Sequence, residues 1–167
     1  MGFPEDLLEQ AQFLVRREPS KPKQASLRRA VSTAYYAVFH LLTWEAADQA
    51  APKNPGGLKI RVTRSLEHNS MKKAAQQFES GNFPDAIKPL VSSLIPTALV
   101  EVARNFVLLQ DERHAADYDR TRAFSRARAQ TAVDAASRVL VNWKAIKDTD
   151  DARAFLAWLI FPKLGSR

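Results

Sequence analysis

The longest helical pattern in this chain lies in residues 24–50, QASLRRAVSTAYYAVFHLLTWEAADQA. Their apolar members recur at steps of three and four, the spacing of one buried face of an α-helix. This face comprises Leu27, Val31, Ala34, Val38, Leu41 and Leu42, and it is widened by Tyr35, Phe39 and Trp44. The pattern predicts one long helix at the centre of the fold.

The segments on either side of this helix also carry the helical period, and none shows sustained alternation with period two. Helices are expected over 4–17, 58–79 (as one helix or two), 94–109, 120–146 and 151–161. The main breaks are PKNPGG at 52–57, HAADYD at 114–119 and Pro162, and Asp119 is the expected N-cap of the helix that follows it. The sequence therefore predicts an all-α domain over 1–167, a bundle of four to six helices with two long antiparallel helices as its spine.

The composition excludes several classes of protein. The chain has 167 residues and no cysteine, which rules out disulfide frameworks, thiolate zinc sites and cysteine nucleophiles. No two of the histidines, His40, His68 and His114, have the i,i+4 spacing that presents two metal ligands on a helix, so no metal is expected. The sequence also lacks a Gly-x-x-x-x-Gly-Lys loop, and no other cofactor is expected. The formal net charge of +7 favours an anionic partner such as RNA.

The sequence predicts a cytoplasmic protein that does not enter a membrane. Glu5 and Asp6 stand where a secretory signal would carry basic residues. The longest apolar stretches, AVSTAYYAVFHLL and AFLAWLIF, are too short to span a bilayer.

A dense polar segment, DERHAADYDRTR at 111–122, holds the candidate catalytic residues Arg113, His114, Asp117 and Tyr118. On a continuous helix Arg113 and Asp117 share a face, as do His114 and Tyr118, because both pairs are four residues apart. Two interpretations stay open. Arg113 and Asp117 form a structural ion pair, or Arg113 and His114 form a site that handles an anion.

Two further groups are candidates for substrate binding. The run RTRAFSRARAQ at 120–130 is the most concentrated basic patch, and it is expected in the first turns of a long helix; its arginines are Arg120, Arg122, Arg126 and Arg128. Tyr36 and His40 extend a polar line beside the apolar face of the 24–50 helix. The alternative for His40 is a half-buried structural side chain.

Two motifs together resemble a known family. SLRRAVSTAYYAVFHLL at 26–42 is similar to the tyrosine-rich second helix of bacterial HEPN-domain proteins, and RHAADYD at 113–119 resembles the Arg-x-x-Ala-Asp-Tyr signature of one bacterial branch. The similarity runs in order from Gln24 to Trp143. It implies a bundle of four or five helices, commonly a homodimer with its groove at the interface.

The resemblance also implies a function. Many HEPN proteins are metal-independent endoribonucleases, often the toxin of a toxin–antitoxin pair, so RNA and a cognate antitoxin are the expected partners. Their site is an arginine followed after four to six residues by a histidine, a pattern that Arg104-Asn105 begins but does not complete. His114 would then relay a proton and Arg113 would bind phosphate. The alternative is a catalytically inactive binding or scaffold protein in which the ADYD segment is structural.

The run AFLAWLIF at 154–161 predicts a homodimer independently. Its large apolar residues are nearly contiguous and cannot all face one core, so Trp158 and Phe161 are expected to need another cover. A second copy of the chain would supply it, or the first helix would lie over them.

Overall fold

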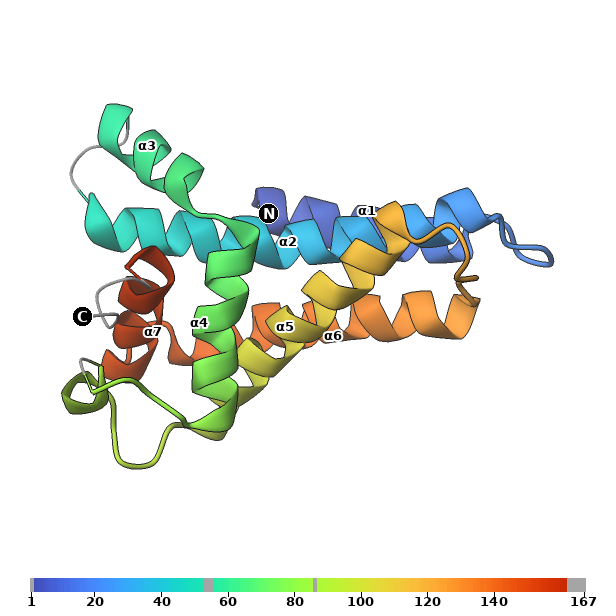
Figure 1. Ribbon diagram of the computed structural model, residues 1–167. Helices are drawn as coiled ribbons and strands as arrows, with labels where there is room; N and C mark the ends of the chain where they lie inside the picture. Colours follow the sequence, from blue (N-terminus) through green and yellow to red (C-terminus); the bar gives the residue numbers. More distant parts are fainter. Residues whose placement is uncertain (1, 53–55, 86, 162–167) are drawn as a thin grey trace. The chain divides into compact units, whose positions relative to one another are not determined.

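The computed structural model describes residues 2–52, 56–85 and 87–161, and within these ranges it is entirely helical, without a strand (Figure 1). The elements are α1 (Phe3–Arg16), α2 (Gln24–Ala50), α3 (Gly57–Ser65), α4 (His68–Ser80), the 3-10 turn η1 (Lys88–Leu90), α5 (Thr97–Tyr118), α6 (Arg126–Ile146) and α7 (Asp150–Ile160). The all-α prediction is confirmed, and the bounds predicted for α2 agree with the structure. Residues 53–55 of the predicted breaker and Pro162 lie outside the described residues.

The chain divides into two compact units. Unit 1 comprises Met1–Leu41 and Asn105–Leu140, and unit 2 comprises Leu42–Arg104 and Val141–Arg167. The single domain over 1–167 and the HEPN-like arrangement of its helices remain predictions.

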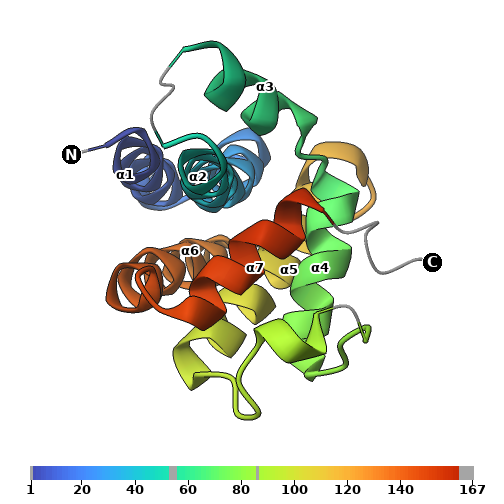
Figure 2. The same cartoon turned by 90° about the vertical axis from the view of Figure 1, so that its left-hand side faces the viewer.

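In unit 1, α1 and the first part of α2 form an antiparallel pair joined by residues 17–23 (Figures 1 and 2). Pro4 stands in the first turn of α1, where its missing N–H costs no hydrogen bond, and Glu5 and Asp6 face the positive end of the helix dipole. The buried face of α1 is Leu8, Ala11, Leu14 and Val15; Leu7, which the helical period also places on this face, is only half-buried. Deeper in the unit, the fully buried Tyr35 ring of α2 stacks on Phe106 of α5, with 5.8 Å between ring centroids.

The connection between α5 and α6 differs from its prediction. The HAADYD segment does not interrupt the helix, because α5 continues to Tyr118 and buries Ala115 and Ala116. Asp119 is not an N-cap, since its carboxylate accepts hydrogen bonds from the backbone and hydroxyl of Thr121. α6 begins only at Arg126, where the Ser125 hydroxyl accepts the N–H of Arg128 at 3.1 Å. Residues 119–125 therefore form a loop.

In unit 2, α4 and α7 pack against each other through the Phe78 and Phe155 rings, 5.0 Å apart. Gly81, with φ of 69°, ends α4 in the left-handed conformation that favours glycine. Trp158 is only 5% exposed, and its indole N–H donates to Oε1 of Gln77 on α4. Trp158 therefore does not need a second copy of the chain as cover, whereas Phe161 is exposed.

Three apolar residues of unit 2 that the helical period places on inward faces are exposed, namely Trp44, Leu58 and Leu94. Trp44 is 53% exposed, and the ammonium of Lys59 lies 3.9 Å from its ring centroid while pairing with Asp48. Leu94 is exposed and precedes α5, which begins after Pro96. The Pro96 carbonyl accepts the N–H groups of Leu99 and Val100, so Pro96 stands just before the first turn of α5, where proline is tolerated.

Candidate nucleic-acid interface

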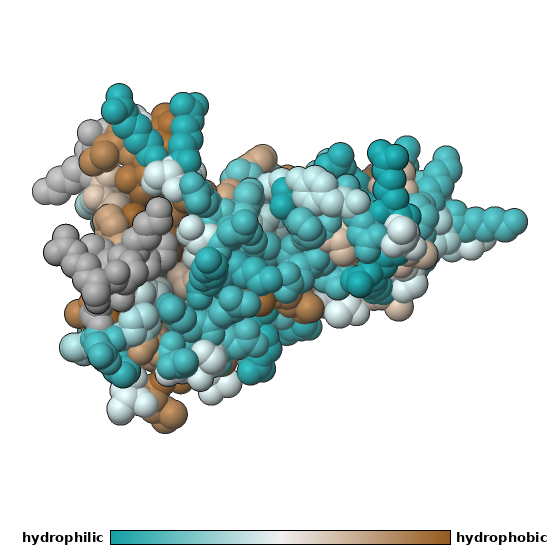
Figure 3. All heavy atoms as spheres, viewed as in Figure 1, coloured by the Kyte–Doolittle hydropathy of each residue, from teal (hydrophilic) through white to brown (hydrophobic). Residues whose placement is uncertain are grey.

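The positive charge of the chain is concentrated at one end of unit 1. Residues 16–29 and 117–128, which we call the basic end, contain ten arginines and lysines and three acidic residues, so they account for the whole formal excess of +7. The two stretches lie together where the 17–23 and 119–125 connections meet (Figure 1), and the surface there is mostly hydrophilic (Figure 3). The exposed cations are Arg16, Arg17, Lys21, Lys23, Arg29, Arg120 and Arg122.

Side-chain hydrogen bonds to the backbone join the two stretches. The Gln24 amide donates to the Phe124 carbonyl at 2.8 Å and accepts the Phe124 N–H at 2.9 Å, as a paired strand would. The Arg126 guanidinium donates to the carbonyls of Glu18 and Pro19. Arg126, predicted to bind substrate, therefore anchors the 17–23 connection.

Arg28 fixes the end of α5. Its guanidinium donates to the carbonyls of Ala116 at 2.7 Å, Asp119 at 2.9 Å and Arg122 at 2.5 Å, with a longer contact to Ala115 at 3.4 Å. The last carbonyls of a helix have no partners within the helix and carry its negative dipole end. One cation thus satisfies the end of α5 and holds the following loop.

Phe124 secures the same loop from its other side. The ring is 2% exposed, with the Arg28 guanidinium 5.1 Å and the Arg128 guanidinium 4.3 Å from its centroid. Arg128 binds both carboxylate oxygens of Glu112, at 2.7 and 2.9 Å, and the hydrogen bonds to Glu112 raise the pKa of the guanidinium. Arg128 therefore stabilises the junction of α5 and α6.

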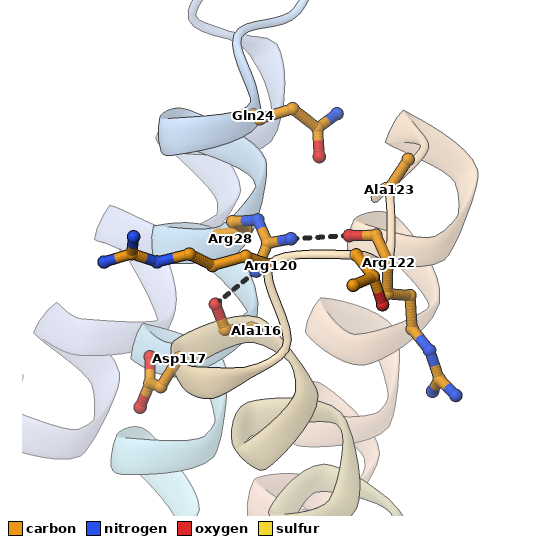
Figure 4. Close-up of a pocket in the computed structure, with 8 residues that line it drawn as sticks. Gln24, Arg28, Ala116, Asp117, Arg120, Arg122 and Ala123 are labelled. Atoms are coloured by element: carbon orange, nitrogen blue, oxygen red, sulfur yellow. Dashed lines mark hydrogen bonds between the residues drawn. The ribbon is translucent and has the colours of Figure 1, made fainter.

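A hollow of about 410 Å³ opens in the basic end between α2, α5 and the loop (Figure 4). It is lined by Gln24, Arg28, Ala116, Asp117, Arg120, Thr121, Arg122 and Ala123. Arg120 and Arg122 lie in the loop and not in α6, the helix predicted to carry them, because α6 begins only at Arg126. Their side chains extend to opposite sides of the loop (Figure 4). Arg122 lies 3.7 Å from the Asp119 carboxylate, and Arg120 has no hydrogen bond or ion pair with another described residue.

Hydrogen bonds stabilise the charged form of Asp119, next to the hollow. The bonds from the Thr121 hydroxyl and N–H, helped by Arg122, lower the pKa of Asp119 below its usual value. All three acidic residues of the basic end, Glu18, Asp117 and Asp119, have partners within unit 1. Arg17 and Arg122 lie 3.7 Å from the carboxylates of Glu18 and Asp119, so it is the excess of exposed cations over these carboxylates that would attract an anion from solution.

The Arg113 side chain is turned inward and is 13% exposed. Its Nε lies 2.9 Å from Oδ2 of Asp117, its Nη2 donates to the Tyr36 hydroxyl at 3.2 Å, and Asp117 also accepts from Ser32. Burial acts to lower the pKa of Arg113, but Tyr36 and Asp117 outweigh it and raise the pKa. The structural ion pair predicted from the i,i+4 spacing is confirmed.

His114 and Tyr118 are exposed on α5, with 5.0 Å between their ring centroids. Neighbouring helical residues point about 100° apart, so His114 faces outward while Arg113 faces inward. Within one chain, the predicted pair of Arg113 and His114 is not presented on one open surface. Tyr118 lies beside both, since the Arg113 guanidinium is 5.7 Å from its ring centroid.

His40 has a different environment from the other predicted site residues. Its half-buried ring lies 5.1 Å from Phe3 of α1 and 6.1 Å from Tyr36, between ring centroids. Burial lowers the pKa of His40 below its usual 6.5. The structure joins Tyr36 directly to Arg113 and places His40 against α1.

The burial of His40 predicts that the free energy of unfolding depends on pH. The unfolded chain takes up a proton on His40 as the pH falls through 6.5, whereas the folded chain does so only at lower pH. The free energy of unfolding should therefore fall between about pH 7.5 and about pH 5.5, and less steeply in His40→Gln. Urea denaturation across this range measures both slopes, and equal slopes would remove His40 as the cause.

Sequence reasoning missed Arg28, Gln24 and Phe124 as organisers of the interface. Arg28 and Gln24 stand at the polar start of α2, and nothing in their spacing indicates partners about a hundred residues away. Across residues 2–52, 56–85 and 87–161, no group of three His, Cys, Asp or Glu could hold a metal ion. In the same described part of the chain, no helix is long and apolar enough to cross a membrane.

A scan against protein-family models, a search of curated proteins and a search of solved structures find no match for this chain.

Proposed function

We propose that this chain is a HEPN-like, nucleic-acid-associated protein that binds RNA through the basic end. The observation that carries the proposal is the placement of the whole formal charge excess in residues 16–29 and 117–128, around a hollow with Arg120 and Arg122 at its rim. The basic residues there outnumber the three acidic ones, so positive charge dominates the local field.

The expected mode of binding is electrostatic. Arginine guanidinium groups form forked hydrogen bonds with phosphate oxygens, and each neutralised phosphate releases counterions. Contacts of this kind carry no base sequence information. We expect sequence-tolerant binding of RNA that weakens steeply as salt rises.

Fluorescence anisotropy with a labelled RNA of about ten nucleotides tests this proposal. Binding should weaken by at least about tenfold between about 50 and about 200 mM salt. Arg120→Glu/Arg122→Glu should weaken it further and flatten the salt dependence. The matched control is Arg61→Glu/Arg64→Glu on α3, where two exposed arginines undergo the same charge reversal.

Binding that ignores salt, or that both double variants weaken equally, would overturn the proposal. Arg126 is unsuitable for this test because it anchors the 17–23 connection, so its replacement would change the structure as well as the charge.

A metal-independent endoribonuclease, of toxin–antitoxin or defence type, is the second candidate function. It is favoured by the exposed His114 ring, one turn before the end of α5 and close in sequence to the hollow. A histidine can relay the proton of a 2′-hydroxyl as that oxygen attacks the neighbouring phosphorus and the 5′-oxygen leaves. Arg113 is committed to Asp117, so the available phosphate donor is Arg120.

Incubation with total RNA in EDTA distinguishes this candidate from a protein that only binds. A ribonuclease should produce 2′,3′-cyclic phosphate ends, and His114→Ala should abolish them even at protein and RNA concentrations that saturate binding. Intact RNA would support the inactive binding or scaffold protein, with the ADYD segment held by Arg113 and Arg28. Cleavage that survives His114→Ala would remove His114 from the mechanism.

The homodimer and the cognate antitoxin are proposals that depend on the family resemblance alone, because α4 covers Trp158. Light scattering should give a mass of about twice 18.7 kDa for a dimer. A mass of 18.7 kDa at micromolar concentration would contradict it.

A further inference from the structure

Two aromatic side chains stand unburied beside the basic end. Tyr118 is 65% exposed and ends α5, and His114 lies on the same face of the helix, one turn earlier. Their ring centroids are 5.0 Å apart, with 50° between the ring planes. Arg113 supports Tyr118 from the protein side, since its guanidinium lies 5.7 Å from the ring centroid.

Packing does not account for these rings, because both are exposed, whereas Tyr35 on α2 is completely buried. Tyr118 is separated from Arg120 by one residue, and Asp117 beside it lines the hollow. An anionic chain held at the hollow that continues along the last turn of α5 would reach the two exposed rings. A protein surface that combines cations with exposed aromatic rings suits a polymer that has both phosphates and flat apolar groups.

We infer that His114 and Tyr118 stack on unpaired bases of a single-stranded RNA whose phosphates are held by Arg120 and its neighbours; this inference rests on the proposed RNA binding. Stacking on an aromatic ring needs an open base face, which a single strand offers. In a duplex the bases are stacked and paired already, and the rings gain nothing. The site therefore selects single strands over duplexes.

Three probes of equal length test the inference by anisotropy: a single strand, the matching duplex and a strand of abasic sugar phosphates. All three carry 2′-O-methyl groups, so that no 2′-hydroxyl can react. We expect the single strand to bind about tenfold more tightly than the other two. Tyr118→Ala should remove this preference and leave abasic binding unchanged, while Tyr118→Phe, which retains the ring, should keep it.

The three probes distinguish a failure of base stacking from a failure of RNA binding itself. Equal, salt-dependent binding of all three probes, unaffected by Tyr118→Ala, would overturn base stacking and leave the proposed function intact. No binding of any probe at low salt would overturn both. Because Tyr118 is largely exposed, Tyr118→Ala should melt like the parent chain, and the abasic comparison does not depend on any variant.

Discussion

Replacing Arg28 with methionine is expected to lower the free energy of unfolding by about 3 kcal/mol. Methionine retains much of the apolar stem but leaves the carbonyls of Ala116, Asp119 and Arg122 without their donor. Hydrogen bonds from a charged group are each worth about 1.5–3 kcal/mol, and water recovers part of that loss at this half-buried site. Urea denaturation followed by circular dichroism measures the change.

The neighbouring Arg29 provides the control, because it is exposed and Arg29→Met removes the same charge. Its expected effect is below about 0.5 kcal/mol. Arg28→Lys should be intermediate, since an ammonium is a compact donor and cannot reach carbonyls that a planar guanidinium spans. Equal effects of Arg28→Met and Arg29→Met would show that Arg28 does not hold the 119–125 loop.

Phe124→Ala is expected to cost about 3–4 kcal/mol. The ring is almost fully buried, so its removal leaves a cavity and deprives the Arg28 and Arg128 guanidinium groups of the surface they cover. Thermal and urea unfolding should both report the loss. Phe13→Ala, at a 63% exposed position on α1, should cost less than about 1 kcal/mol.

Arg28 and Phe124 hold the same loop, so their effects should not add. The variant with both replacements should be more stable than the two single losses predict, by about 0.5 kcal/mol or more. A loss of less than about 1 kcal/mol for Phe124→Ala alone would mean that the loop packs equally well without the ring.

The helices of this chain could largely be predicted from sequence, because each long one buries a face with a regular period. The bounds of α2 and the buried face of α1 followed directly from this period. The start of α6 was predicted too early, because the position of Phe124 fits the period of the helix although this residue lies in the loop before it. A single aromatic ring that is buried from a loop leaves no regular spacing of apolar residues in the sequence.

The candidate site could be predicted only in part. Helical spacing identified the Arg113–Asp117 pair, because i,i+4 neighbours meet wherever the helix is continuous. Composition identified the arginines of the 120–130 run but not their partners. Arg126 and Arg128 are bound to carbonyl and carboxylate groups of other segments, whereas Arg120 and Arg122 face solvent. Only the three-dimensional fold distinguishes arginines that hold other segments of the protein from arginines that can bind a ligand.

The most direct test of the central claim is to locate the RNA by amide chemical-shift changes during titration with a short single strand. We predict that the largest changes fall within residues 16–29 and 114–128, and that Arg120→Glu/Arg122→Glu abolishes them at equal concentrations. The basic residues of α3 and of 144–153 should remain unaffected. Changes centred on those segments, with residues 16–29 and 114–128 unmoved, would contradict the account.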